Sequence, residues 1–449
     1  LLLSQREPQF DVALDKQIAE AADDFTRIAL KAKAAKDYFL LVGPPGTGKT
    51  SCALKKMVET FYKEEGAQIL LLSYTNRAVD EICKALSSIR PEVDFIRVGS
   101  ELSCDENYRD HLIENELATC MRRTEVCERI NRCRILVGTV ASISGKPELF
   151  RLKHFDVAIV DEATQILEPQ LLGILCAKGE NGKEGVGKFI LIGDHKQLPA
   201  VVLQNTEQSE VYDEALSAVG LKNLKDSLFE RLYRTARQHT DAHRTYDMLC
   251  RQGRMHPEVA LFANQAFYEG RLLPVGLPHQ LEDSGNINRL SFYPSRPEPM
   301  GSSAKTNHSE AKIAARLAAT VYKEHSEAFD ASRTLGIITP YRSQIALIKK
   351  EIEVLGISEL NQILIDTVER FQGSERDVII YSFCVNYPYQ LKFLSNLTEE
   401  DGILIDRKLN VALTRARKQM LLTGVPTLLE RNPLYKSLLK LIESLRNIA

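Results

Sequence analysis

One run of eight residues combines glycines, a lysine and threonines, which are types that bind triphosphates: Gly43, Pro44, Pro45, Gly46, Thr47, Gly48, Lys49 and Thr50. The run follows an apolar segment, 38–42, and precedes a segment of helical pattern that we expect to begin near Lys49. Glycines let successive backbone N–H groups turn toward phosphate oxygens, and a helix N-terminus adds a favourable dipole. We therefore predict a phosphate-binding loop in which Lys49 reaches the β- and γ-phosphates and the Thr50 hydroxyl binds Mg²⁺. A coincidental glycine-rich turn is the alternative, and the flanking strand and helix argue against it.

Two acidic residues, Asp161 and Glu162, directly follow a second apolar run, 157–160. Acidic pairs usually lie on the solvated surface. At the carboxyl end of a buried strand, however, these two would lie beside the phosphate-binding loop. There we expect Asp161 to hold Mg²⁺ through water and Glu162 to orient or deprotonate the attacking water.

A third polar run, from Gly193 to Gln197, follows the apolar segment 189–192. Gln197 is the candidate γ-phosphate sensor, because its amide can hydrogen-bond both the terminal phosphate and the lytic water. We interpret His195 in the same run as a satisfied surface imidazole, which is the commoner state of a lone histidine.

The elements that must position these residues are alternating strands and helices. Short apolar runs that end in polar loops are typical of buried parallel strands, with active residues at their carboxyl ends. Such runs occupy 38–42, 68–73, 134–138, 157–160, 189–192, 335–339, 378–383 and 419–423. The predicted fold class is α/β, with two RecA-like P-loop NTPase lobes, each a mainly parallel sheet flanked by helices.

We place an N-terminal helical segment at 1–37, the first lobe at 38–245 and the second lobe at 246–449. The charged, helix-patterned stretch at about 101–133 is expected to be an insertion in the first lobe. Two polar, proline-containing stretches, 274–305 and 386–401, are expected to be surface loops.

The length of 449 residues, with 44% hydrophobic and 26% charged residues, allows two or three domains with substantial cores. No window approaches the roughly 20 uncharged apolar residues that span a bilayer, and Leu1–Leu3 run straight into polar residues. We therefore expect no membrane partner and no signal peptide. A net charge of −2 means that any nucleic-acid site must be a local concentration of Lys and Arg. The missing N-terminal Met leads us to expect a fragment whose parent protein has further domains.

Nine cysteines, with no Cys-x-x-Cys pair, indicate reduced thiols in an intracellular protein, cytoplasmic or nuclear. Four of them share one segment: Cys104, Cys120, Cys127 and Cys133. A metal or iron–sulfur site is one alternative there. We favour ordinary helix-face thiols, because the spacing matches no known ligand pattern.

Further runs follow in order along the chain: Leu72 to Asn76, Val137 to Thr139, Gln252 to Pro257, Thr339 to Arg342, Thr367 to Gly373 and Asn410 to Arg417. With the runs above, they resemble superfamily 1B helicases over nearly the whole chain. The most similar branch contains the nonsense-mediated-decay RNA helicase and the helicase part of the Okazaki-fragment nuclease-helicase. The runs Asp37-Tyr38 and Asp161 to Gln165 look closer to the latter.

The resemblance implies roles for further residues. Arg254 and Arg415 match arginines that reach across the cleft between the lobes to the γ-phosphate, where such groups stabilise charge in the transition state. Glu375 matches the glutamate that contacts the nucleotide sugar. Residues matching the motifs along the single-strand track are Thr75, Asn76, Thr139, Thr339, Tyr341, Arg342 and Thr367. Hydroxyls, amides and arginine bind phosphates there without reading sequence.

Two features depart from the family pattern. Gly253 stands where the family often has a Tyr that stacks on the base, so the adenine is held less selectively or by another aromatic such as Tyr246. The upstream glutamine that reads adenine has one nearby candidate, Gln17, which lies further from the loop than usual.

The resemblance predicts an ATP-dependent nucleic-acid translocase and helicase that uses ATP and Mg²⁺. Single-stranded DNA is the favoured partner, with 5′-to-3′ movement. An RNA helicase is one alternative, because phosphate contacts do not distinguish the sugars. A nucleotide-switched nucleic-acid-binding ATPase without unwinding is another. A phosphate-loop ATPase unrelated to nucleic acid would leave the second-lobe motifs unexplained. The chain contains no recognisable nuclease constellation.

Overall fold

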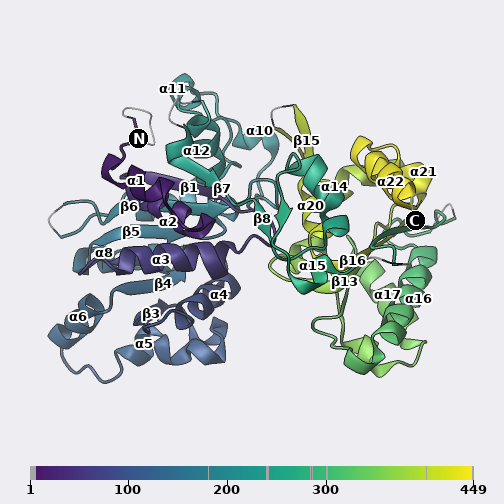
Figure 1. Ribbon diagram of the computed structural model, residues 1–449, viewed down its shortest axis with the longest axis horizontal. Coiled ribbons are helices and arrows are strands. Elements are labelled where there is room, and N and C mark those ends of the chain that lie inside the picture. The colour runs from purple at the N-terminus through teal and green to yellow at the C-terminus, as the bar shows by residue number, and fades with distance from the viewer. Residues whose placement is uncertain are drawn as a thin grey trace. The chain divides into compact units, whose positions relative to one another are not determined.

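The computed structural model describes residues 7–180, 182–238, 242–283, 285, 287–299, 302–400 and 402–446 (Figure 1). Internal contacts divide the chain into two compact units. Unit 1 comprises Leu1–Pro44, Gly48–His195 and Pro199–Leu249. Unit 2 comprises Pro45–Thr47, Lys196–Leu198 and Cys250–Ala449.

Unit 1 contains a seven-stranded parallel sheet in the order β3-β4-β2-β5-β6-β1-β7. Its strands are β1 (Tyr38–Val42), β2 (Ile69–Ser73), β3 (Phe95–Val98), β4 (Ile135–Thr139), β5 (Phe155–Val160), β6 (Val186–Gly193) and β7 (Tyr246–Met248). The central strands β1, β2 and β4 are buried at every position, which explains their continuous apolar sequences.

Alternate strand residues of unit 1 serve two separate cores, because successive side chains of a strand point to opposite faces. Phe39 and Leu41 join the core beneath α2 (Asp24–Ala34), α3 (Lys55–Tyr62) and α4 (Asn76–Ser87). Leu40 and Val42 join the core beneath α7 (Val140–Ser144), α9 (Glu168–Leu175) and α12 (Leu228–Ala236). Helices therefore cover both faces, and α2 and α3 are seen crossing the sheet in Figure 1.

Shorter helices complete unit 1. They are η1 (Val12–Leu14), α1 (Asp15–Ala19), η2 (Lys49–Leu54), α8 (Glu148–Leu152), η5 (Ala163–Gln165), α10 (Thr206–Ser209), α11 (Glu214–Ala218) and α13 (Ala242–Thr245). Between β3 and β4 the segment expected to be a helical insertion forms η3 (Glu101–Ser103), η4 (Glu106–His111), α5 (Ile113–Glu116) and α6 (Arg123–Arg132). Arg129 anchors this segment through ion pairs to Glu116 at 2.7 Å and Asp94 at 3.0 Å.

Unit 2 contains a five-stranded parallel sheet in the order β10-β16-β13-β11-β12. Its strands are β10 (Leu290–Pro294), β11 (Leu335–Ile338), β12 (Leu364–Asp366), β13 (Arg376–Ser382) and β16 (Ala416–Gly424). One face packs on α16 (His308–Glu324) and α17 (Arg342–Glu353), where small residues of α16 such as Ala314 and Ala318 meet Ile337 and Ile380.

Two short strand pairs and further helices complete unit 2. Strands β8 (Arg251–Gln252) and β9 (Leu273–Pro274) pair in parallel, and β14 (Leu397–Glu400) and β15 (Ile403–Asp406) form an antiparallel hairpin. The helices are α14 (Pro257–Phe267), α15 (Pro278–Leu281), η6 (Ser326–Ala328), η7 (Ser358–Gln362), α18 (Val368–Phe371), η8 (Pro388–Gln390), α19 (Leu391–Leu394), α20 (Arg407–Leu413), α21 (Pro426–Leu429) and α22 (Pro433–Arg446).

The predicted α/β class is confirmed, and each of the eight predicted strands is present. The expected lobe boundary at Tyr246 falls inside the structure of unit 1, because β7 pairs with β1 and the unit continues to Leu249. The expectation of surface loops needs correction. Segment 274–305 contains β10, an edge strand held by β16, and segment 386–401 contains η8, α19 and β14. Prolines near β10 fit its edge position, because an edge strand tolerates a missing donor.

Candidate active site

The predicted phosphate-binding loop directly follows β1 and leads into η2, a wide helical turn that continues as α3. Gly48 has a φ of 76°, in the left-handed region that glycine enters without strain. A side chain at Gly43 would place its Cβ 2.1 Å from Cγ of Lys49. Only glycine therefore lets the stem of Lys49 fold across the start of the loop. The helix expected near Lys49 begins at that residue.

Four side chains predicted to do chemistry lie together at the carboxyl ends of β1 and β5. Thr50 Oγ1 donates a hydrogen bond of 2.5 Å to Asp161 Oδ2, and Lys49 Nζ lies 3.8 Å from Glu162 Oε1. An ammonium group suits phosphate oxygens, and hydroxyl and carboxylate oxygens are the ligands that Mg²⁺ prefers. The cluster fits a triphosphate with its metal ion.

Asp161 is the buried member of this cluster, with 1% of its surface exposed. Burial, reinforced by the neighbouring charge of Glu162, raises the pKa of Asp161 to about 6, against the opposing Thr50 hydrogen bond and Lys49 charge. Because burial makes this carboxyl costly to ionise, an adjacent divalent cation would stabilise its ionised form.

Glu162 has a left-handed backbone, with a φ of 53°. This conformation costs a non-glycine residue about 1–2 kcal/mol, and such strain is concentrated at functional sites. Gln165 Nε2 donates to Glu162 Oε2 at 3.0 Å, and the Glu162 amide donates to Asp161 Oδ1 at 2.9 Å. The turn therefore aims the Glu162 carboxylate back toward Lys49.

His195 needs a correction, because it is buried rather than on the surface. Only 5% of the residue is exposed, and its ring centroid lies 4.5 Å from that of Tyr233 and 6.4 Å from that of Phe229. This packing supports the end of β6 and the turn that leads to Gln197.

Unit 2 brings together Gln197 and the two arginines predicted to reach the γ-phosphate. Arg415 is 2% exposed; its Nη2 donates to Gln197 Oε1 at 3.3 Å, and its Nε donates to Val411 O at 3.0 Å. Arg254 Nε donates to Glu375 Oε2 at 2.5 Å. The residue predicted to contact the nucleotide sugar thus holds a predicted phosphate-binding arginine.

A second cation, Arg417, also lies on Glu375, at 3.6 Å, and pairs with Asp377 at 2.9 Å. Burial raises the pKa of Glu375, but the charges of Arg254 and Arg417 outweigh burial and leave the pKa below its usual value. Glu375 is therefore a carboxylate, able to accept hydrogen bonds from guanidinium groups or sugar hydroxyls.

Gln252 is a positioning residue that the sequence did not reveal. Its buried Oε1 accepts hydrogen bonds from the amides of Arg254 at 3.0 Å and Met255 at 2.7 Å. His279 Nε2 lies 2.8 Å from the Arg254 carbonyl oxygen. The backbone of Arg254 is therefore fixed from two sides. Only the position of Gln252, two residues before the arginine, could have suggested this.

The position of Gly253, where the family often has Tyr, is closely approached by another segment. A Cβ at Gly253 would lie 3.1 Å from Leu277 Cδ1 and 3.3 Å from Val275 Cγ2. These two apolar side chains are partly exposed, at 42% and 41%. They occupy the space into which a larger residue at 253 would extend.

The other candidates for adenine recognition belong to unit 1. Tyr246 lies in β7, and its ring packs edge-on against Tyr233 with centroids 5.1 Å apart. Gln17 is exposed in α1. These observations do not indicate that either residue binds adenine.

The predicted strand-track residues of unit 1 stand where neighbouring strands end. Thr75 and Thr139 cap α4 and α7, accepting hydrogen bonds from Ala78 N at 3.2 Å and Ser142 N at 3.1 Å. Thr75 is exposed, whereas Thr139 is buried. Asn76, partly exposed, is the first residue of α4. Since β2 and β4 are neighbours in the sheet, these residues share one edge.

The predicted strand-track residues of unit 2 lie after β11 and β12. Tyr341 is half-buried and occupies the N-cap position of α17 without a side-chain hydrogen bond to the helix. Arg342 is exposed at the first position of that helix, and Thr367 precedes α18. Thr339 is fully buried. The exposed Arg342 is the member of this group best placed to meet a phosphate.

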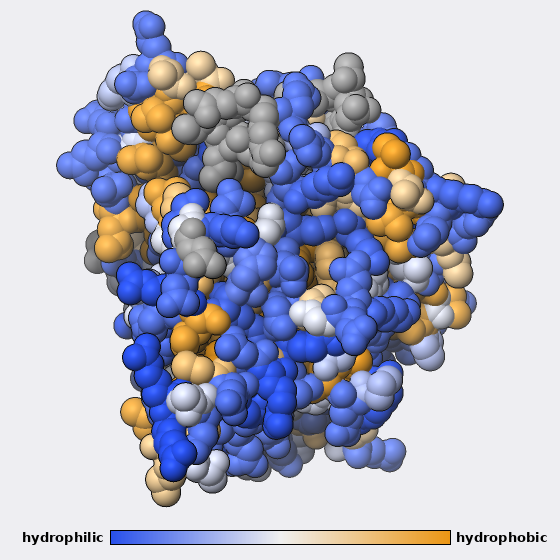
Figure 2. Space-filling view, turned by 90° about the vertical axis from the view of Figure 1, so that its left-hand side faces the viewer, coloured by the Kyte–Doolittle hydropathy of each residue, from blue (hydrophilic) through white to orange (hydrophobic). Residues whose placement is uncertain are grey.

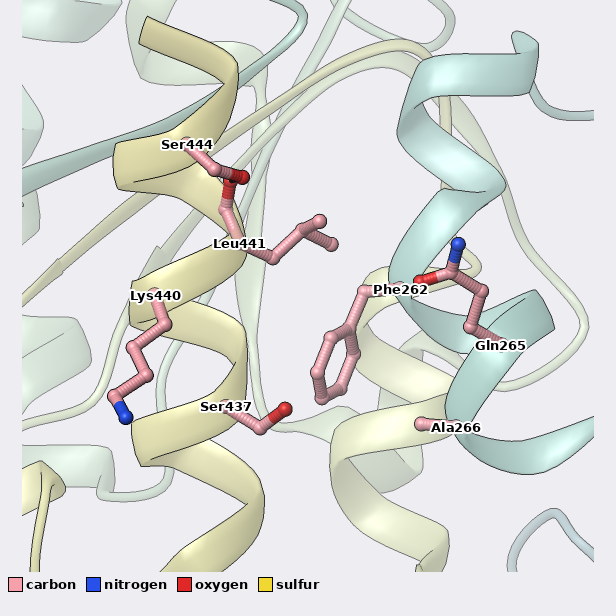
Figure 3. Close-up of a pocket in the computed structure, with 7 residues that line it drawn as sticks. All are labelled: Phe262, Gln265, Ala266, Ser437, Lys440, Leu441 and Ser444. Carbon is pink, nitrogen blue, oxygen red and sulfur yellow. Dashed lines mark hydrogen bonds between the residues drawn. The ribbon is translucent and has the colours of Figure 1, made fainter. Parts of the chain in front are cut away.

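A separate pocket of about 480 Å³ lies in unit 2 between α14 and α22. Phe262 and Leu441 point toward each other across it, while Lys440 points away (Figure 3). None of the predicted site residues lines this pocket.

The cysteines are free thiols. Within the described part of the chain, no three His, Cys, Asp or Glu side chains come together as a metal site. No helix among the described residues is long and apolar enough to cross a membrane. The face drawn in Figure 2 is mostly hydrophilic, with hydrophobic residues in separated groups.

Comparisons with known proteins agree with this arrangement. A family model described as an AAA domain matches residues 20–126 and 113–205, and a second AAA domain model matches 224–427. The DNA replication ATP-dependent helicase/nuclease DNA2 of Xenopus laevis is 31% identical over 428 residues, covering 88% of this chain and 36% of that protein. Its Bos taurus counterpart is 28% identical over 497 residues, covering 99% of this chain and 42% of that protein.

The chain covers a larger share of a yeast relative. The DNA polymerase alpha-associated DNA helicase A of Saccharomyces cerevisiae is 26% identical over 482 residues, covering 91% of this chain and 65% of that protein. The chain thus spans less than half the length of the two vertebrate relatives and less than two thirds of the yeast protein.

Proposed function

The chain is a superfamily 1 helicase core made of two AAA domains, and from this premise we propose that it is an ATP-dependent translocase and helicase on single-stranded nucleic acid. We favour DNA as its substrate and 5′-to-3′ as its direction. Its similarity to proteins named as DNA helicases supports the choice of DNA.

The observation that carries this proposal is the convergence of Lys49, Thr50, Asp161 and Glu162 in unit 1. We assign Lys49 to the β- and γ-phosphates. Thr50 and Asp161 would hold Mg²⁺, which supplies charge neutralisation for the phosphate oxygens. Glu162 orients the attacking water and accepts its proton, a role for which its carboxylate is aimed by the strained turn.

We assign the stabilisation of negative charge on the transferred phosphoryl group to residues of unit 2. Arg254 and Arg415 stabilise that charge, and Gln197 senses the terminal phosphate. These roles require the guanidinium groups to contact the phosphates that Lys49 binds. Arg254 must then leave Glu375, which is freed to contact the sugar.

Stepping follows if each unit holds the strand and the strength of its hold depends on the nucleotide state. We propose that Thr75, Asn76 and Thr139 hold it in unit 1, and that Thr339, Tyr341, Arg342 and Thr367 do so in unit 2. A role on DNA further leads us to propose an intracellular, nuclear or cytoplasmic site of action.

The test is the ATPase rate with single-stranded DNA, single-stranded RNA or no polymer, at several salt concentrations. We expect Mg²⁺-dependent hydrolysis that DNA stimulates most, with stimulation falling as salt rises because phosphate contacts release counterions. Stimulation by RNA alone would identify an RNA enzyme. A rate that no polynucleotide changes would overturn the proposal. Displacement of an annealed strand, measured in parallel, separates a helicase from a nucleotide-switched binding ATPase.

A further inference from the structure

An exposed aromatic surface stands in unit 2 after the end of β13. We call Tyr387, Tyr389 and Phe393 the aromatic platform. Tyr389 is 55% exposed and Phe393 is 66% exposed. The rings of Tyr387 and Tyr389 are nearly parallel, with an angle of 12° and centroids 5.8 Å apart. Because large aromatic side chains normally bury their faces, this exposure calls for a partner.

The backbone leading to the platform is shaped by a buried carboxylate. Cys384 has a φ of 49°, a left-handed conformation that is strained for a residue with a side chain. Its amide donates to Glu310 Oε2 at 2.8 Å, and Ser382 Oγ donates to the same oxygen at 2.7 Å. Glu310 is 0% exposed. The chain is therefore forced to turn as it leaves the sheet.

A buried glutamine fixes the platform itself. Gln390, 2% exposed, accepts hydrogen bonds from the amides of Asn386 and Tyr387, both at 2.9 Å. Its Nε2 donates to Ala304 O at 2.7 Å and to Tyr341 Oη at 3.2 Å. The platform is thus preorganised, and one hydrogen bond ties it to a residue predicted to lie on the strand track.

Sheet register explains why these two segments meet. Strands β11 and β13 are parallel neighbours, with Ile338 opposite Tyr381. The segment containing Tyr341 and Arg342 and the segment containing the platform therefore leave the same edge of the sheet. Both carry an exposed cation, Arg342 and Lys392. Neither cation has an ion-pair partner among the residues that the structure describes.

We propose that the aromatic platform is a base-stacking subsite for single-stranded nucleic acid, with Tyr389 as its outer ring and Arg342 and Lys392 facing the adjacent phosphates. The inference rests on the proposed function and adds a contact that involves the bases rather than the backbone. Aromatic rings beside cations are the combination that holds single strands without reading their sequence. An exposed ring already stacked on a second ring presents one free face to a base.

The test compares two oligonucleotides of equal length, oligo-dT and an abasic version that keeps the phosphates and lacks the bases. Binding to the full chain is measured by fluorescence anisotropy for wild type, Tyr389→Ala and Tyr389→Phe. Tyr212→Ala is the matched control, because Tyr212 is a 79% exposed tyrosine of unit 1. We expect Tyr389→Ala to bind oligo-dT about 5-fold to 150-fold more weakly, from the usual strength of base–aromatic stacking. Tyr389→Phe and Tyr212→Ala should bind like wild type, and no variant should change binding of the abasic strand.

Three results would overturn the subsite while leaving the proposed function standing. In the first, wild type binds both oligonucleotides equally. In the second, Tyr389→Ala loses affinity for both strands to the same extent, which would show a structural role. In the third, Tyr389→Ala keeps its affinity for DNA but sediments as a smaller species than wild type, which would show a protein interface. Failure of the wild-type chain to bind either strand would overturn the proposed function as well.

Discussion

Thr50 Oγ1 donates a hydrogen bond of 2.5 Å to Asp161 Oδ2, which joins the phosphate-binding loop to the end of β5 within unit 1. The two residues are 111 positions apart in the chain, and parallel strands bring them together. The bond holds a hydroxyl and a carboxylate oxygen, two oxygens of the kinds that bind Mg²⁺, side by side in the fold. Preorganisation of this kind reduces the reorganisation that metal binding requires.

Replacing Thr50 should therefore weaken the use of Mg²⁺. Thr50→Val keeps the shape of the side chain and removes the hydroxyl, so we expect at least about a 10-fold loss of Mg²⁺-dependent ATPase activity. Thr50→Ser restores the hydroxyl and should recover most of it. The measurement is ATPase rate against Mg²⁺ concentration for the three proteins. Equal Mg²⁺ dependence in Thr50→Val and wild type would remove Thr50 from the metal site.

Glu162 and Lys49 should separate the chemical step from binding. Glu162→Gln keeps the size of the side chain and cannot accept a proton, so kcat should fall by about 10²-fold to 10⁴-fold while ATP still binds. Lys49→Ala should abolish turnover and weaken ATP binding, because it removes the positive charge that Lys49 places beside the phosphates. Rates are measured by phosphate release and binding by a fluorescent ATP analogue, with circular dichroism to confirm folding. Hydrolysis by Lys49→Ala at the wild-type rate would show that the nucleotide site is misassigned.

Two arginines that share one carboxylate provide a matched test of transition-state stabilisation. Arg254 and Arg417 both contact Glu375, at 2.5 Å and 3.6 Å, but only Arg254 matches a γ-phosphate arginine of the family. Arg254→Ala should lower kcat by at least about 10³-fold. Arg417→Ala should lower it by less than about 10-fold, since it removes only ion pairs to Glu375 and Asp377 and no predicted phosphate contact. Single-turnover hydrolysis at saturating ATP measures both, and equal losses would contradict the assignment of Arg254.

The sequence predicted those parts of the site whose signals are local. Lys49, Thr50, Asp161 and Glu162 follow apolar runs that are buried strands, and strand ends converge wherever a parallel sheet forms. The pairing of Arg254 with Glu375, 121 residues away, depends on tertiary structure and leaves no local pattern. The same holds for β10, whose strand conformation comes from pairing with β16. The prediction that His195 lies on the surface is wrong, because nothing in the local sequence indicates that the ring of Tyr233 packs on it.

Glu310 should make the stability of unit 2 depend on pH. Burial raises the pKa of this carboxyl from 4.5 to about 7, against hydrogen bonds from Cys384, Ser382 and Ser295 that lower it, while the charge of Glu298 raises it further. A pKa raised in the folded state contributes stability that is complete below pH 4.5 and is lost as pH rises through 7. The loss amounts to about 3 kcal/mol, because each pKa unit corresponds to about 1.4 kcal/mol.

Glu310→Gln removes the ionisable group. The hydrogen bonds can remain, because the carbonyl oxygen of the glutamine can still accept from Cys384 and Ser382 while its amide faces Ser295. We therefore expect the variant to gain about 2–3 kcal/mol relative to wild type between pH 5 and pH 8, because part of the loss in wild type already occurs below pH 5. Hydrogen exchange in peptides from α16 and β13, followed through urea unfolding, reports unit 2 alone. Glu324→Gln, an exposed change on the same helix, should show no such gain. A constant difference between Glu310→Gln and wild type across this range would mean that Glu310 does not titrate there.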